Sequence, residues 1–150
     1  MRVLTGRQWF CKWRIAIVIC FSLIVMPPAD ALEIVVNREV STSQLSRGEL
    51  QAIFTMRVRV WPDGLPIKVF VLSDNTSEQS EFAKKILDIF PYQLRRYWDR
   101  LVFSGTGQAP IELASPGEMY NRIATTPGAI GYLTADYIGN QVRIIKVNNP

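Results

Sequence analysis

The run IKVFVL at residues 67–72 is the feature that most limits what this chain can fold into, because five of its six residues are apolar. A strand with one face in water alternates apolar and polar residues, whereas a nearly continuous apolar run is typical of a strand buried on both faces. Strands of this kind belong to parallel sheets that helices cover on both sides. The run therefore predicts an α/β domain.

Two helices can be placed from their first residues. Ser46 and Glu49 stand three positions apart, as do Ser115 and Glu118, and this is the spacing of a capping box. Each pair predicts the start of a helix. Strand-like runs alternate with the helical patterns, which predicts a mixed, mostly parallel sheet flanked by helices. The expected strands are residues 33–37, 67–72, 111–114, 129–133 and 143–147.

Two further helices are expected in the middle of the chain. A helix over residues 78–90 carries an apolar residue at every fourth position, and Pro91 begins the next helix. In that next helix, Arg95 lies four residues before Asp99, the spacing of a helical ion pair. Both helices are predicted to pack through apolar stripes, formed by Phe82, Ile86 and Phe90 in the first and by Leu94, Tyr97, Trp98, Leu101 and Val102 in the second.

Residues 1–31 have the order of a secretory signal peptide. A positively charged start is followed by the uncharged run from Ile15 to Met26 and then by an A-x-A cleavage pattern at residues 29–31. A run of this length rises about 18 Å as a helix, less than the roughly 30 Å hydrocarbon core of a bilayer. We therefore expect cleavage before Leu32, a periplasmic or secreted domain at residues 32–150, and no stable membrane span.

Removal of this segment changes what the composition implies. Four of the 17 basic residues and one of the 13 acidic residues lie in it, so residues 32–150 carry a net charge of +1. That charge, in an exported protein, argues against a nucleic-acid partner. Both cysteines, Cys11 and Cys20, lie in the segment, and the chain has no histidine. We therefore expect no disulfide, no metal site of cysteine or histidine, and no cofactor.

The stretch TTPGAIGYL, residues 125–133, combines a helix end with the start of a strand. Pro127 stops the preceding helix, and Gly128 allows a positive φ where the chain leaves that helix. Gly131 allows another backbone or a ligand to approach the strand closely. The stretch predicts a tight helix-to-strand connection under a packed sheet, in preference to a direct ligand contact.

Several motifs, taken together and in order, resemble one known family. They are LSRGELQAIF, a tryptophan followed by Asp-Gly, a buried strand that leads into SDNTS and a helix, FSGTGQ, and TPGAIGYL. Across residues 41–136 the chain is similar to the phosphate-binding periplasmic proteins of ABC transporters. The resemblance implies the type II periplasmic binding-protein fold. Members of that family have two lobes and about twice this length, so we expect this chain to form a single lobe.

The resemblance also implies an anion loop, which this chain has altered. In the family, an arginine precedes a Ser/Ala-Asp-Gly-Ser-Gly-Thr loop whose hydroxyls and N–H groups hold phosphate at a helix N-terminus. Here Leu72 stands at the arginine position and Glu78 at the threonine position, where its carboxylate repels an anion. The loop therefore predicts either a weak oxyanion site or an ordinary helix cap. Its candidate ligand residues are Ser73, Asp74, Asn75, Thr76 and Ser77.

Other residues could add to such a site. The loop Ser104–Gly107 has two glycines and two hydroxyls, so Gly105 and Thr106 are candidates for an anion-binding nest, with a plain turn as the alternative. A replacement for the missing guanidinium would have to come from elsewhere in the chain. Sequence alone does not place Arg57, Arg59 or Arg122 beside Thr76.

Three functions remain to be weighed. The leading hypothesis is an exported binding module that holds phosphate or another oxyanion weakly. The alternative is a periplasmic accessory or adaptor protein with no small ligand, which binds another protein or a second copy of itself through the face that a second lobe would cover. Glu78 and Glu81 form an acidic pair at helical spacing, but no base or nucleophile accompanies them. We therefore expect no enzyme.

Overall fold

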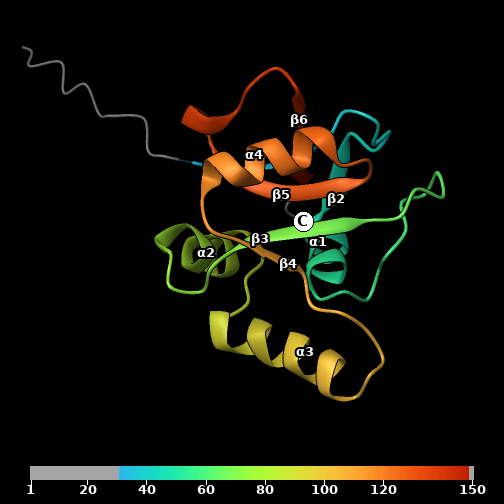
Figure 1. Ribbon diagram of the computed structural model, residues 1–150, viewed down its shortest axis with the longest axis vertical. Helices are drawn as coiled ribbons and strands as arrows, with labels where there is room; N and C mark the ends of the chain where they lie inside the picture. Colours follow the sequence, from blue (N-terminus) through green and yellow to red (C-terminus); the bar gives the residue numbers. More distant parts are fainter. Residues whose placement is uncertain (1–30, 149–150) are drawn as a thin grey trace, which may run out of the picture.

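The computed structural model describes residues 31–148, and a six-stranded sheet runs through its centre (Figure 1). The strand order is β2-β6-β1-β5-β3-β4. β1 pairs antiparallel with β5 and β6, whereas β2–β6, β3–β5 and β3–β4 are parallel pairs, so every described strand except β1 runs in one direction. This confirms the mixed, mostly parallel sheet. The strands are β1 (Leu32–Asn37), β2 (Gln44–Ser46), β3 (Lys68–Leu72), β4 (Ile111–Leu113), β5 (Ala129–Thr134) and β6 (Val142–Asn148).

Helices cover both faces of the sheet, as the apolar run at residues 67–72 predicted. In Figure 1, α4 lies on one face, and α1, α2 and α3 lie on the other. Phe70 and Val71 are neighbours on β3, so their side chains point to opposite faces, and both are buried. The helices are α1 (Arg47–Phe54), α2 (Ser77–Glu81), the π-helical turn η1 (Phe82–Ile86), α3 (Pro91–Phe103), α4 (Pro116–Thr125) and the 3-10 turn η2 (Ala135–Tyr137).

Aromatic side chains join the helices on the α1 side to the sheet. Phe82 of η1 stacks on Tyr132 of β5 with ring centroids 3.9 Å apart, and Phe54 of α1 lies 4.6 Å from Phe82. The indole Nε1 of Trp98 on α3 donates to the Phe54 carbonyl oxygen at 2.8 Å. Each buried side chain of this size contributes about 1.5–3 kcal/mol. This cluster therefore fixes α1, η1 and α3 against one another.

The capping signals place α1 and α4 as expected, with one difference. Ser46 and Glu49 form the complete capping box, because each accepts a hydrogen bond from the other's backbone N–H. At α4, the Ser115 hydroxyl accepts from the Glu118 N–H at 3.2 Å. Glu118 in turn accepts from the N–H of Ala114 at 3.0 Å and not from that of Ser115. The second box is therefore displaced by one residue.

The helix expected over residues 78–90 is wrong in its last four residues. The chain forms α2 and the turn η1, and the helical conformation ends at Ile86. Asp88 has a φ of 53°, a left-handed conformation that turns the chain away from the helix axis. Phe90 is extended, as a residue before proline should be, and its side chain is 56% exposed. Phe90 therefore does not belong to the predicted apolar stripe.

The predicted stripe of α3 is only partly buried. Leu94 and Trp98 are core residues, whereas Tyr97 and Val102 are 47% and 52% exposed. The difference arises because α3 packs through one narrow edge against other helices, and no described element covers its remaining apolar positions. The side of α3 that carries Tyr97 faces solvent.

The stretch at residues 125–133 forms the tight connection that was predicted. Gly128 has a φ of 73°, and a Cβ atom there would clash with the carbonyl oxygen of Pro66. A Cβ atom at Gly131 would lie 2.8 Å from Cδ1 of Ile123 on α4. Helix α4, and not a ligand, is what approaches the strand at Gly131. The Trp61 indole donates to the Gly128 carbonyl oxygen at 3.0 Å and covers this junction.

Residues 1–30, which are all but the last residue of the predicted signal peptide, lie outside the described residues. Within residues 31–148, no helix combines the length and the apolar character that crossing a membrane requires.

Strand β2 was not predicted. It has three residues, of which Leu45 alone is buried, and so it carries no periodic signal.

Candidate functional site

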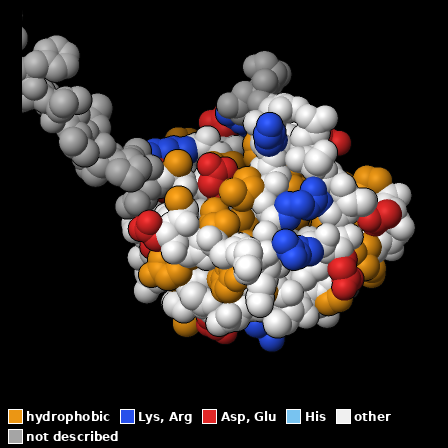
Figure 2. Space-filling model, turned by 90° about the horizontal axis from the view of Figure 1, so that it is seen from above, with side chains coloured by type: hydrophobic (Ala, Val, Ile, Leu, Met, Phe, Trp, Pro, Cys, Tyr) orange, Lys and Arg blue, Asp and Glu red, His pale blue; other side chains and the backbone are white. Residues whose placement is uncertain are grey.

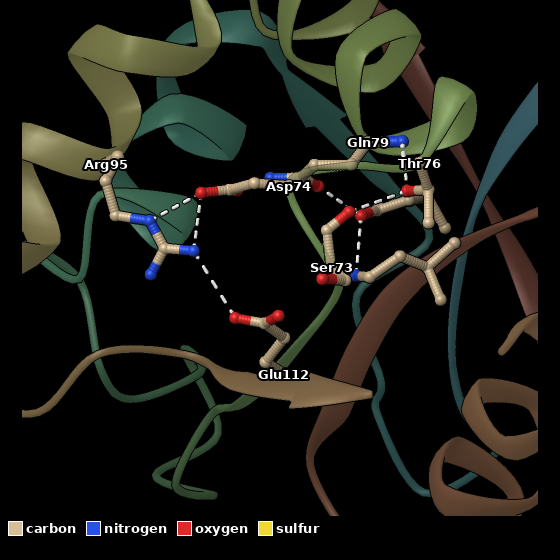
Figure 3. Close-up of polar contacts among 8 residues, drawn as sticks. Ser73, Asp74, Thr76, Gln79, Arg95 and Glu112 are labelled. Carbon is tan, nitrogen blue, oxygen red and sulfur yellow. Dashed lines mark hydrogen bonds and ion pairs between the residues drawn. The ribbon is translucent and has the colours of Figure 1, made fainter. Parts of the chain in front are cut away.

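The loop Ser73–Ser77 lies where β3 ends and α2 begins, at the carboxyl edge of the parallel strands (Figures 1 and 3). The Thr76 hydroxyl donates to the Ser73 carbonyl oxygen at 2.8 Å and accepts from the Gln79 N–H at 3.2 Å. The Thr76 N–H also donates to the Ser73 carbonyl oxygen, at 3.0 Å. Thr76 is therefore the N-cap of α2.

Several backbone N–H groups of this loop and of the first turn of α2 are unpaired within residues 31–148. The N–H groups of Asn75, Ser77 and Glu78 make no hydrogen bond to any residue in the described range 31–148. They precede or open a helix, where unpaired N–H groups and the positive end of the helix dipole attract negative charge. The loop can therefore supply donors to an anion.

Carboxylates already surround these donors. The Asp74 carboxylate binds Arg95 of α3, whose Nε and Nη2 lie 2.6 and 2.5 Å from Asp74 Oδ2. Arg95 Nη2 also lies 3.3 Å from Oε2 of Glu112 on β4 (Figure 3). Glu78, in the first turn of α2, accepts from the Ser77 hydroxyl at 2.9 Å. These three carboxylates outnumber the single guanidinium, so the formal charge of the group is −2.

Arg95 is the residue of this region that sequence reasoning missed. The predicted ion pair between Arg95 and Asp99 is absent among the described contacts, because Arg95 extends instead to Asp74 and Glu112. Nothing local in the sequence signals these contacts, because they depend on β4 lying beside β3. Partial burial acts to lower the pKa of Arg95, but the hydrogen bonds and charge interactions with Asp74 and Glu112 together outweigh it, so the pKa is raised.

The arginines considered from sequence lie elsewhere. Arg57 donates to the Thr55 hydroxyl, and Arg59 donates to the carbonyl oxygens of Met56 and Thr106. The Arg122 guanidinium lies over the ring of Phe70, 5.5 Å from its centroid. None of the three makes a hydrogen bond or ion pair with the loop Ser73–Ser77.

A buried tyrosine holds the loop in place. The Tyr132 hydroxyl on β5 accepts from the Leu72 N–H at 2.8 Å and donates to Oε1 of Gln79 on α2. Burial is the main cause that raises the pKa of Tyr132 far above its ordinary value, so the phenol stays neutral. Tyr132 therefore ties β5, β3 and α2 together directly behind the candidate site.

The loop Ser104–Gly107, a candidate anion nest, forms the plain turn that was the alternative to it. The N–H groups of all four residues donate to carbonyl oxygens of the last turns of α3, and Gly105 has a φ of 67°. This is the closing turn of a helix C-terminus, where exposed carbonyl oxygens disfavour an anion. The loop also precedes β4, so it lies at the edge of the sheet opposite Ser73–Ser77. Gly105 and Thr106 therefore do not join the loop residues in one site.

Metal binding has no support in the described part of the chain. Within residues 31–148, no group of three or more aspartate, glutamate, histidine or cysteine side chains is arranged to hold a metal ion. The carboxylates near Arg95 are bridged by its guanidinium instead.

The family of the chain follows from its fold and from a direct match. A family model described as the PBP superfamily domain matches residues 28–146. The chain belongs to the PBP superfamily. Two solved structures similar to this PBP-superfamily chain are an ABC-type phosphate transport receptor from Vibrio cholerae and PstS from Borrelia burgdorferi. Their TM-scores are both 0.62, with 16% and 20% sequence identity.

These matches confirm the resemblance and the fold class. The alignments cover 79% of the PBP-superfamily chain but only 46% of the Vibrio protein and 47% of the Borrelia protein. The chain thus spans less than half the length of the solved structures it matches. At these identities the likeness establishes the fold and leaves the ligand to be argued from the residues of the site.

Proposed function

We propose that this protein is an exported binding module, a single lobe of the PBP-superfamily fold, which binds phosphate or another oxyanion weakly at the loop Ser73–Ser77. The observation that carries the proposal is the set of free N–H groups at Asn75, Ser77 and Glu78, at the start of a helix and at the carboxyl edge of the sheet. Ligands of open α/β sheets bind at this edge. The phosphate transport receptor among the similar structures supports the choice of anion.

Weak binding follows from the charges at the loop. Within residues 31–148 the loop has no free guanidinium, since Arg95 is held by Asp74 and Glu112. A charge-assisted hydrogen bond to a phosphate contributes about 1.5–3 kcal/mol, and this loop lacks it. The carboxylates of Asp74 and Glu78 also repel an oxyanion. A single lobe leaves one side of the ligand in water, which further limits affinity.

The same geometry favours a second candidate, an accessory protein that binds another protein and no small ligand. The observation that favours it is the neutralised Arg95, because the loop then keeps a negative charge when it is empty. In this second candidate function, the fold serves as a scaffold for contacts with another protein. Both candidates are binding functions, and we propose neither a catalytic role nor a cofactor.

Calorimetric titration with phosphate and with sulfate at low salt separates the two candidates. The protein is used in the form in which it accumulates after export. Saturable binding in the millimolar range is expected, and Ser77→Ala, which keeps the Thr76 cap, should weaken it. Ser43→Ala, at an exposed serine whose hydroxyl makes no hydrogen bond within residues 31–148, serves as the matched control. Absence of heat with both anions would eliminate the oxyanion site and leave the accessory function.

Export is tested separately by the mass of the accumulated protein. Cleavage at the A-x-A pattern should give a chain that begins at Leu32. A chain that keeps residues 1–31 in the membrane fraction would contradict the proposed periplasmic or secreted location.

A further inference from the structure

A groove runs along the outer side of α3, away from the loop Ser73–Ser77. It has a volume of about 280 Å³, and Ile89 lines one end of it. The other lining residues lie at helical spacings of three and four, so they form one continuous stripe on α3. They are Gln93, Arg96, Tyr97 and Arg100.

The two arginines of this groove are not neutralised by the protein. Arg96 and Arg100 are exposed and make no ion pair or hydrogen bond through their guanidinium groups within residues 31–148. Asp99 is next to Arg100 in sequence, yet it is not within ion-pair distance of either arginine. Arg95, on another side of the same helix, is held by two carboxylates. The groove therefore presents two free guanidiniums one helical turn apart.

Exposed aromatic rings lie on the same helix as the arginines. Tyr97 lines the groove and is 47% exposed. Phe90 and Tyr92 stack on each other at the start of α3, with ring centroids 5.8 Å apart, and both are exposed. Phe103 at the other end of α3 is 88% exposed. Arginine and aromatic residues are the types that protein interfaces concentrate at their centres.

The opposite side of the molecule has a different character. Figure 2 shows the face on the α4 side, where basic, acidic and apolar side chains are interspersed. A mixed surface of this kind is typical of a solvated face. The outer side of α3, by contrast, combines unpaired positive charge with exposed rings.

We propose that the outer side of α3 docks an acidic segment of a protein partner. Carboxylates of the segment pair with Arg96 and Arg100, and an apolar side chain packs between Ile89 and Tyr97. A free small anion is a poorer occupant, because exposed guanidiniums are screened by water and salt and bind a lone ion weakly. A peptide adds apolar contact to the same charge pairing. This inference deepens the accessory-protein form of the proposed function and is independent of the loop Ser73–Ser77.

The test is fluorescence anisotropy of a labelled peptide that alternates glutamate with leucine, added to the protein as it accumulates after export. Binding is expected at low salt and should weaken as salt is added. The double variant Arg96→Gln/Arg100→Gln should bind about tenfold more weakly. The variant Arg38→Gln/Lys68→Gln removes the same charge from exposed residues outside the groove and should bind like the unaltered protein.

Several outcomes would overturn the inference. Equal binding of a peptide with glutamine in place of glutamate would show that the carboxylates are not recognised. Unchanged binding by Arg96→Gln/Arg100→Gln would place the peptide elsewhere, while the accessory function would stand. The proposal that α3 docks an acidic segment would also be contradicted if the peptide does not bind at all. It would equally be contradicted if the protein forms a dimer that Arg96→Gln/Arg100→Gln dissociates. Loss of phosphate binding alone would affect the oxyanion proposal and leave this inference intact.

Discussion

The Arg95 guanidinium contacts a single carboxylate oxygen of Asp74 through two nitrogens, Nε at 2.6 Å and Nη2 at 2.5 Å. The contact joins α3 to the loop between β3 and α2, and it neutralises a positive charge that lies beside that loop. Both side chains are more than one-third exposed, so the pair contributes little to stability. Its main effect is on the electrostatic potential that an anion meets at the loop.

Replacing Asp74 with asparagine should therefore improve phosphate binding. The change removes one repelling carboxylate and leaves Arg95 with Glu112 as its remaining charged partner, at 3.3 Å. We expect phosphate affinity to rise about tenfold, which is the lower end of the range for a charge-assisted hydrogen bond. Calorimetric titration at low salt measures the change. An affinity equal to that of the unaltered protein would indicate that no anion binds at this loop.

Glu39→Gln is the matched control for that experiment. Glu39 is an exposed acid in the turn after β1, at the opposite end of the strands, and its side chain makes no hydrogen bond or ion pair within residues 31–148. Its neutralisation changes the net charge of the protein by the same amount. Phosphate affinity should stay the same in this variant, which separates a local effect from a general one.

Tyr132→Phe should destabilise the protein although it changes a single oxygen atom. The Tyr132 hydroxyl accepts from the Leu72 N–H and donates to Gln79, and all three groups are buried. Each buried polar group left without a partner costs about 1–3 kcal/mol. We expect the free energy of unfolding to fall by at least that amount in a denaturant titration. Tyr137→Phe should leave it unchanged, because Tyr137 is half-exposed and its hydroxyl makes no hydrogen bond to the described part of the chain.

Local signals were sufficient to predict much of the fold. Ser46 and Ser115 start helices because their hydroxyls satisfy N–H groups three residues ahead, which requires no knowledge of the rest of the chain. Gly128 marks the turn before β5 because its positive φ would be strained for any residue type with a side chain. The apolar run at residues 67–72 predicted a largely parallel sheet covered by helices, because its composition alone indicates a strand buried on both faces.

The features that were missed depend on contacts between distant segments. Arg95 reaches Asp74 and Glu112 because β3 and β4 are neighbours, and no spacing in the sequence encodes that adjacency. The periodicity of α3 identified an apolar side that included Val102, but periodicity cannot say whether another element covers it. The loop Ser104–Gly107 has the composition of a nest, yet its N–H groups are used to end α3.

Gly128→Ala should destabilise the junction between α4 and β5. The backbone there has a φ of 73°, and a Cβ atom would clash with the Pro66 carbonyl oxygen, which is backbone and cannot easily move. We expect a loss of about 1–3 kcal/mol, as for other overpacked positions, and a lower melting temperature. Gly48→Ala places a methyl group in open space on α1 and should be neutral or slightly stabilising. Equal effects at both glycines would contradict this account.

The stability of the protein should depend on pH through Glu49 at the start of α1. Hydrogen bonds from the backbone and then the side chain of Ser46 lower the pKa of Glu49 below 4.5 in the folded protein. A carboxyl group with a depressed pKa stabilises the fold above its unfolded pKa, and that contribution is lost as pH falls through the folded pKa. Glu49→Gln should therefore melt at a lower temperature than the unaltered protein at neutral pH, and the difference should shrink as pH drops below 4.5. Thermal unfolding followed by circular dichroism across this pH range measures the difference, with Glu39→Gln as the control that lacks a capping contact. If the difference in melting temperature between Glu49→Gln and the unaltered protein stays constant with pH, the charge of Glu49 does not stabilise the cap.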